Sequence, residues 1–511
     1  MSFESTIKEF DVKHSVVLKD ELIPVVINIS SAMGTISRVV SISNKVCVES
    51  VVSNIGSAQI EGKVHSVILI RNIDGTFDTL NSSTNFTLPI INQSIVVDSE
   101  ILCSAKMGTL SGVQASENMV NFTANVVIKP ILIVGEKLKL LESLGANIEQ
   151  KRDNIEIKDI IAATSQDFEI NVELDLPNSI SKVLSIDSHA IVKKAETGND
   201  MIVLHGELFC NMLYLTADEE PKLKNHRYIQ EFTHELLANG VVLTDFVSAT
   251  ICDQESTFEL TGEITSAKGT VVLNNKLKAN LVISQLKTME SVVDAFCPIY
   301  NLNSNYVDIE EQQISTAYFV EKIDGNISFG EDAERIDRVL SVNDGNVIIS
   351  DVVLTAGVVS IKGVLNSDVV YQLDTEEARI ESVLAEIPFE VKLKDDRVDE
   401  NTICTLDIKT RDIDARNKRA KEIDVLAEIS ISINIINNNK KTVLQDINLG
   451  EKRTQNIMPF GYYIIPEAQS LWDASKLLLV SGDLIMAQNP DLQFPITSPQ
   501  KVIIYRQKVV E

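Results

Sequence analysis

The chain has 511 residues, of which 44% are hydrophobic and 23% are charged, and its formal net charge is −27. This composition is typical of a globular protein, and at roughly 150 residues per domain the length predicts about three domains. Because phosphate backbones are bound by clustered lysine and arginine, the acidic charge argues against a nucleic-acid-binding surface.

The beginning of the chain shows no targeting signal. Residues 1–15 contain neither a basic segment nor the apolar core of a signal peptide. The most apolar stretch, 126–135, contains Lys129 and Pro130 and has about half the length that a membrane-spanning helix needs. The 6 cysteines include no C-x-x-C pair, which is typical of neither a disulfide scaffold nor a zinc site. We therefore expect an intracellular protein without a membrane span.

Three stretches of the chain share a local pattern, in which an aliphatic residue, a polar residue, a basic residue and two further aliphatic residues follow in the same order. They are TISRVVSI from Thr35, SISKVLSI from Ser179 and RIDRVLSV from Arg335. A match this short could be a coincidence, so the test is whether later landmarks keep the same offsets.

The later landmarks do keep their offsets. A glycine expected to open an alternating strand lies 26, 26 and 27 residues past Ile36, Ile180 and Ile336, at Gly62, Gly206 and Gly363. Eight residues further come Ile70, Tyr214 and Tyr371, and then a phenylalanine at Phe86, Phe232 and Phe389. A final strand is expected at 122–128, 277–283 and 425–433. These spacings predict three divergent copies of one domain.

Within each copy the pattern is that of β-strands, because alternating runs rich in branched and aromatic residues end at turn residues. The expected fold is mainly β, with three tandem β-sandwich-like domains at 1–150, 151–300 and 301–454 and a small βααβ domain at 455–511. The copies are expected to follow one another as separate domains, and the sequence leaves their mutual packing open. The connector 138–153 has aliphatic residues at helical spacing, which predicts a short helix.

No catalytic or metal-binding pattern is present. The 6 histidines lack the spacing of a helical metal site, and the phosphate-binding and nucleophile-elbow motifs are missing. Cys103, Cys252 and Cys404 occur once per copy, and thiols in three separate domains do not easily share a metal, so we interpret them as buried strand residues. Cys297 lies in a connector and is the thiol to test for reactivity. We predict no enzyme, no cofactor and no metal.

The assembled repeat resembles the SPOCS domain of spore-coat and exosporium morphogenetic proteins from endospore-forming bacteria. The third copy matches best: a basic residue with Val-Leu at 338–340, a strand from Gly363 to Tyr371, and Ile-Pro-Phe at 387–389. The second copy is a fair match, and the first has Ile70 in place of the tyrosine.

Residues 462–506 resemble a LysM domain, with a strand, two helices and a closing strand. The matching residues are Ser470, Leu471, Trp472, Leu484, Asn489, Pro490, Leu492, Pro495, Ile496, Gln500 and Lys501. Trp472, the only tryptophan, is expected to face the core of this domain together with Leu477 and Leu478, and Ser481 or Asp483 to start the second helix. Two loop glycines of the family are replaced by Ala468 and Pro499, which changes the loops that grip N-acetylglucosamine polymers.

The resemblance implies a non-enzymatic assembly protein, because tandem SPOCS domains followed by a LysM domain occur among coat-assembly proteins. It would act in the mother-cell cytoplasm at the spore surface and dock on other spore-coat morphogenetic proteins, with the coat-basement ATPase as one candidate. The alternative is a protein that binds peptidoglycan or N-acetylglucosamine polymers, with the β domains as spacers. In both cases the resemblance implies binding through the two LysM loops, whose residues are Ala468, Gln469, Ser470, Leu471, Asn489, Pro490, Asp491 and Leu492.

Overall fold

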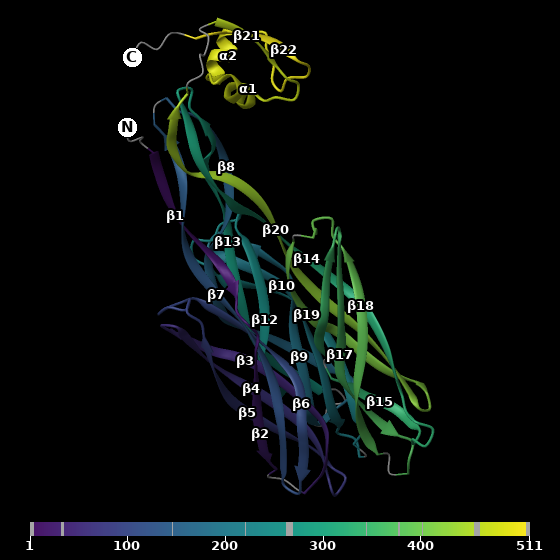
Figure 1. The fold of residues 1–511 in the computed structure, drawn as a ribbon. Coiled ribbons are helices and arrows are strands. Elements are labelled where there is room, and N and C mark those ends of the chain that lie inside the picture. Colours follow the sequence, from purple (N-terminus) through teal and green to yellow (C-terminus); the bar gives the residue numbers. More distant parts are fainter. Residues whose placement is uncertain are drawn as a thin grey trace.

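In a computed structural model of the chain, strands make up most of the described residues and two short helices lie near the C-terminus (Figure 1). The structure describes residues 5–31, 35–145, 147–219, 221–261, 269–343, 345–376, 379–400, 402–453 and 460–506. The prediction of a mainly β fold is confirmed.

The first group of strands, here the first unit, forms two antiparallel sheets. Its strands are β1 (Ser5–Val17), β2 (Glu21–Ser30), β3 (Ile36–Asn54), β4 (Ser57–Asn72), β5 (Phe77–Ile91), β6 (Ile101–Ser116) and β7 (Met119–Leu144). β3, β4 and β5 form a meander, and β7 pairs with β1, β2 and β6. The two sheets enclose one hydrophobic cluster, to which the meander contributes Ile60 and Phe86 and the other sheet contributes Ile27 and Phe122.

The second and third units have the same arrangement of sheets. The second unit consists of β8 (Glu149–Leu176), β9 (Ile180–Thr197), β10 (Met201–Thr216), β11 (Leu223–Leu237), β12 (Phe246–Thr261) and β13 (Gly269–Phe296). The third unit consists of β14 (Tyr300–Ser328), β15 (Ile336–Val342), β16 (Asn346–Thr355), β17 (Val358–Leu373), β18 (Ile380–Lys394), β19 (Ile403–Arg419) and β20 (Glu422–Lys452). β10 and β17 are the central strands of the two meanders, while β13 and β20 are the central strands of the other sheets. In each unit, residues of both sheets again form one hydrophobic cluster.

The glycine and phenylalanine landmarks occupy the same place in each meander. Each glycine is the sixth residue of a 16-residue strand and lies directly opposite the phenylalanine of the next strand, as in Gly206 and Phe232. A Cβ atom on Gly206 would lie 2.4 Å from Phe232 Cζ. The missing side chain therefore lets the phenylalanine ring lie over the strand. The expectation that the glycine opens the strand is wrong, since it lies well inside.

Three pairs of strand ends continue beyond the units as a stalk. β1 with β7, β8 with β13, and β14 with β20 form its three antiparallel strand pairs, which extend toward the C-terminal helices (Figure 1). A lower cluster in the stalk contains Val12, Leu140, Ile155, Ile157, Met289, Ile309 and Val443. A tip cluster contains Leu141, Leu144, Val292, Ala295, Leu444 and Ile447. All three units contribute to both clusters, so the stalk joins them.

The helix predicted at 138–153 is wrong, because this connector forms the end of β7 and the start of β8. Leu138 and Leu140 pack on the lower cluster, whereas Leu141 and Leu144 pack on the tip cluster. The pairing with β1 skips Glu142, which lies between Leu141 and Leu144, as at a β-bulge. The apparently helical spacing of the leucines is therefore produced by a strand whose register changes.

Equivalent residues of the three units also meet in one cluster, here the axis cluster. Its buried members are Val40, Leu184 and Leu340 from the repeated motif, Leu69, Leu213 and Val370 from the central meander strands, and Leu223 and Ile380. Because two sets of three equivalent positions converge, the units are related by a pseudo-threefold axis. The sequence left the mutual packing of the units open, and the structure shows that they pack against one another.

The C-terminal module contains β21 (Phe460–Ile465), α1 (Leu471–Leu478), α2 (Gly482–Gln488) and β22 (Gln500–Tyr505), with β21 and β22 antiparallel. Ser470 caps α1 in a reciprocal capping box with Asp473, and Ser481 caps α2. The caps satisfy free backbone N–H groups at both helix starts. Small apolar residues, among them Ile465, Ala474 and Ile504, form the core of the module.

Candidate functional site

The first predicted LysM loop is held by backbone and capping contacts. Ala468 has φ of +62°, a left-handed conformation that favours glycine. Its N–H donates to Ile496 O at 2.7 Å, and the Ile496 N–H donates to Gln469 O at 3.0 Å. Ser470 is occupied as the cap of α1, and Leu471 packs on the core of the module.

The second predicted loop is fixed mainly by Asn489. Its Oδ1 accepts the Ile503 N–H at 2.9 Å, and its Nδ2 donates to Ile503 O at 2.9 Å and Ile485 O at 3.0 Å. Leu492 packs on the core of the module, while Pro490 and Asp491 are exposed. The side chains of Asn489 and Leu492 thus have structural contacts, and the role of the loop in binding glycan or a partner stays a prediction.

Trp472 connects the module to the stalk. Its ring lies 5.3 Å from that of Phe296 between centroids, and its Nε1 donates to Asp294 Oδ2 at 2.8 Å. Lys476, one turn along the same helix, contacts Asp294 at 2.8 Å. The prediction that Trp472 and Leu477 face the core of the module is wrong: Leu477 is 58% exposed, and only Leu478 is buried.

Asp294 is the centre of this junction. Burial alone raises the pKa of its carboxyl group, but hydrogen bonds from Lys476 and Trp472, the charge of Lys476 and a hydrogen bond from Tyr306 outweigh it and hold the pKa below its usual value. The ionised form is therefore the one that the junction stabilises.

Replacing Asp294 with asparagine is expected to weaken docking of the module by about 1–2 kcal/mol, because Lys476 and Trp472 lose a charged acceptor. The measurement is Trp472 fluorescence, which should shift to longer wavelength as the ring leaves Phe296. In the unchanged protein docking should persist down to about pH 4 and weaken below it. The reason is that a carboxyl group with a lowered pKa stabilises the docked state at pH values above its pKa in the unfolded chain, and this contribution is lost as the pH falls further. Asp491→Asn, at an exposed position of the module, serves as the control; an equal shift in both variants would contradict the assignment.

The basic residue of the repeated motif bridges neighbouring units at two of three interfaces. Arg38 of the first unit donates to Glu381 of the third unit at 3.2 Å. Lys182 of the second unit donates to Asp78 of the first unit at 2.6 Å. The two carboxylates stand at matching positions of β18 and β5, opposite Tyr371 and Ile70.

The third interface differs because the matching position of β11, opposite Tyr214, is Lys224. Arg338 instead donates its Nε to Gln372 of its own unit at 3.0 Å. Two positive charges at one position would repel each other. A different group of charges joins the second and third units.

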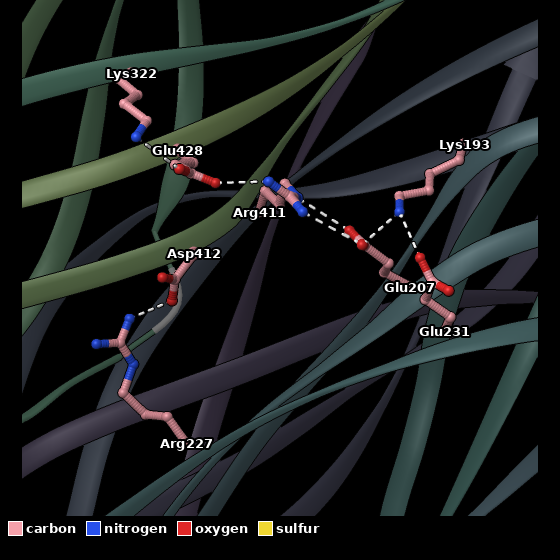
Figure 2. Close-up of polar contacts among 8 residues, drawn as sticks. All are labelled: Lys193, Glu207, Arg227, Glu231, Lys322, Arg411, Asp412 and Glu428. Carbon is pink, nitrogen blue, oxygen red and sulfur yellow. Dashed lines mark hydrogen bonds and ion pairs between the residues drawn. The ribbon is translucent and has the colours of Figure 1, made fainter.

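Arg411 of β19 lies at the centre of that group (Figure 2). Its Nε donates to Glu207 of β10 at 2.9 Å, and its Nη1 donates to Glu428 at 2.7 Å. Lys193 also contacts Glu207, whose side chain is only 5% exposed. Burial alone raises the pKa of Glu207, but Arg411 and Lys193 outweigh it and lower the pKa below its usual value. Figure 2 also shows Arg227 of β11 reaching Asp412 beside this group.

The Arg411→Met variant is expected to lose about 2–4 kcal/mol of stability at pH 7, because Glu207 stays buried with one cation fewer. The measurement is urea unfolding at several pH values. Glu207 contributes through a lowered pKa, so its contribution is present above about pH 4.3 and is lost as the pH falls further. The difference between variant and parent should therefore shrink in acid. Lys322→Met removes the 80% exposed partner of Glu428 and should change stability by less than about 0.5 kcal/mol; similar losses in both variants would refute the role given to Arg411.

A central cavity of about 1960 Å³ lies between the three units. Cys103, Cys252 and Cys404 all line it, one from each unit. Cys103 is buried, while Cys252 and Cys404 are partly buried. Burial raises the pKa of Cys103 to about 12 and also raises that of Cys252. In the described part of the chain no group of three metal-ligating side chains is present. Cys297, singled out as a thiol to test, is only 3% exposed.

The comparisons with known proteins concern the third unit. Residues 335–418 match the family model described as SipL, SPOCS domain. The matched segment runs from the motif strand β15 through the meander and most of β19, and it includes Gly363, Tyr371 and Phe389. No curated protein and no solved structure shows significant similarity to the chain. None of the described helices has the length and apolar character to span a bilayer.

The sequence alone did not reveal Asp294, Glu207 or Arg411 as contact residues. For the motif cations a signal was present, because a basic residue recurs beside buried aliphatic residues in all three copies. The contacts of Asp294, Glu207 and Arg411 join residues that are far apart in the sequence, so no local sequence pattern indicates them.

Proposed function

We propose that the chain is a non-enzymatic assembly protein of a spore coat or a related envelope layer. The observation that carries this proposal is the SPOCS match at residues 335–418, in the third unit. The third unit packs against two other units, and in all three meanders a glycine lies opposite a phenylalanine of the next strand. The three units are proposed to be copies of one sandwich-like SPOCS domain, and the C-terminal module to be a LysM-like domain.

Rigidity supports a scaffold role. The axis cluster and the two stalk clusters join all three units, and shared apolar cores resist relative motion of the parts that they join. In this proposal the body fixes the position of the module at one end of an elongated molecule (Figure 1). The module then docks on another coat protein, with the coat-basement ATPase as the first candidate, at the spore surface in the mother-cell cytoplasm.

A second function is favoured by one observation. Ala468 keeps a left-handed backbone although the residue is no longer glycine, so the first loop retains a turn of the kind that glycine permits. A retained turn would preserve binding of peptidoglycan or N-acetylglucosamine polymers. The two exposed residues of the other loop, Pro490 and Asp491, are the positions at which a glycan contact can be removed without disturbing the core.

The test uses the full chain, immobilised and offered purified sacculi and the recombinant coat-basement ATPase side by side. The assembly proposal predicts retention of the ATPase and no retention of sacculi. Asp491→Arg should reduce whichever binding occurs through the second loop, and Asp332→Arg provides a control at an exposed position of the body. Retention of sacculi alone, lost in Asp491→Arg, would replace the first function by the second.

A further inference from the structure

One face of the β21–β22 sheet is open to solvent and mostly apolar, with Lys501, opposite Ile464, as its charged residue. Tyr462 is 70% exposed and Ile464 is 63% exposed, and Phe460, Ile503 and Tyr505 are between 40% and 56% exposed. Phe460 lies opposite Tyr505 and Tyr462 opposite Ile503 in the register. Because side chains alternate along a strand, all five point to the side of the sheet away from the module core. We call these five residues the outer face.

The free edge of β22 is already occupied within the module. Gln488 donates its Nε2 to Tyr505 O and accepts the Tyr505 N–H, each at 2.7 Å. Asn489 satisfies the backbone of Ile503 in the same way. Side-chain amides thus protect this edge from strand addition. A partner would therefore engage the exposed side chains of the outer face.

The outer face is about as large as the largest apolar patch of a typical monomer. Aromatic side chains have about 150–250 Å² each, so the exposed fractions amount to roughly 500 Å² of mostly apolar surface. The largest apolar patch of a typical monomer is about 300–600 Å² and is often functional. Two such faces packed together would bury roughly 1000 Å², which is near the lower limit for a specific interface.

The charge distribution favours a second copy of the chain as the partner. The formal charge of the whole chain is −27, so contacts between two bodies are repulsive. Residues 460–506 are nearly neutral, since they carry four acidic and three basic side chains. In Figure 1 the module lies at one end of the molecule, with α1 toward the stalk and β21 and β22 on the distant side. Joining two outer faces therefore keeps the acidic bodies at opposite ends.

We propose that two copies of the chain associate through the outer faces of their C-terminal modules and form a tail-to-tail dimer. The contact buries Tyr462 and Ile464 of each copy against the partner's outer face. A contact of roughly 1000 Å² falls in the size class of weak, transient interfaces, so we expect a dimer that dissociates at micromolar concentrations. Docking of Trp472 on Phe296 lies on the other side of the module and is unaffected, so an anchored module can dimerise.

The test is sedimentation equilibrium of the full chain from about 1 to 100 μM, a range that brackets a micromolar constant. The dimer is expected to weaken at least tenfold in Ile464→Glu, because a carboxylate would be buried in an apolar contact. Ile91→Glu introduces the same charge at an isoleucine of the body that is 85% exposed and should leave the dimer unchanged. X-ray scattering should show a dimer with about twice the maximal dimension of the monomer.

Three results would overturn the proposal: a wild-type chain that stays monomeric throughout, a dimer of equal strength in Ile464→Glu, or a dimer lost equally in Ile91→Glu. Unchanged Trp472 fluorescence in Ile464→Glu shows that the module is still folded and docked. If the fluorescence does change, Tyr462→Ser provides the second variant, because it removes apolar area from the outer face without adding a charge.

Discussion

Gly206→Ala is expected to destabilise the protein by about 3 kcal/mol, as measured by urea unfolding followed by circular dichroism. The added Cβ would lie 2.3 Å from Ile191 O and 2.4 Å from Phe232 Cζ. Moving a backbone carbonyl within a paired strand costs free energy, because its neighbours are closely packed, so either the strand or the phenylalanine ring must shift. The same contact is present at Gly62 and Gly363, and similar losses are expected there.

Gly135→Ala is the matched control for this prediction. Gly135 also lies in a strand, but a Cβ there would have no heavy atom within 4 Å. The control should change stability by less than about 0.5 kcal/mol or raise it slightly, since alanine restricts the unfolded chain. A Gly206→Ala protein as stable as Gly135→Ala would show that the phenylalanine does not pack over the glycine.

Leu213→Ala is expected to cost about 3 kcal/mol, because Leu213 is 2% exposed in the axis cluster and its loss leaves a cavity. The cluster belongs to no single unit, so hydrogen exchange should accelerate in the meanders of all three units. Leu237→Ala, at a position that is 77% exposed, should have no measurable effect. Faster exchange confined to the second unit would mean that the axis cluster does not couple the units.

The spacing of the glycine and phenylalanine landmarks, read from the sequence, recurs in the strand register of all three meanders. Gly206, Phe232 and Tyr214 are fixed by contacts within one meander, so each copy must keep their spacing. When such local contacts recur in each unit, the residues that make them recur at the same spacing in the sequence. The same spacing also predicted the position of the third unit, which contains the SPOCS match at residues 335–418.

The stalk and the closure of the units were not predictable in the same way. Leu140 and Leu141 point to opposite faces of β7 and are both buried because a different stalk cluster covers each face, and the sequence pattern resembled a helix. Arg38 and Glu381 are 343 residues apart in the sequence. No local rule joins residues at that separation.

Trp472 illustrates the same limit at the candidate site. A lone tryptophan in a small domain is usually a packing anchor, and it does act as one, but toward Phe296 and Asp294 of the stalk. Its partners come from another unit, so the sequence of the module could not indicate them. The resemblance to a LysM domain predicted Ser470 and Asn489 as binding residues of the loops. In the structure the Ser470 side chain caps α1 and the Asn489 side chain bonds the edge of β22.

Zero-length carbodiimide cross-linking with mass spectrometry tests the closed three-unit body most directly, because it joins only lysines and carboxylates that are in contact. Each interface offers at least one such pair, among them Lys182–Asp78 at 2.6 Å, Lys409–Asp253 at 3.6 Å and Lys106–Asp407 at 3.1 Å. A mixture of isotope-labelled and unlabelled chains separates links within one molecule from links between two.

We expect all three links within single molecules, together with a fourth between Lys476 and Asp294 that reports the docked module. The Lys106–Asp407 link joins the first unit to the third and is the one that closes the body. Its absence, with the other two links present, would show an open chain of units and contradict the scaffold described above.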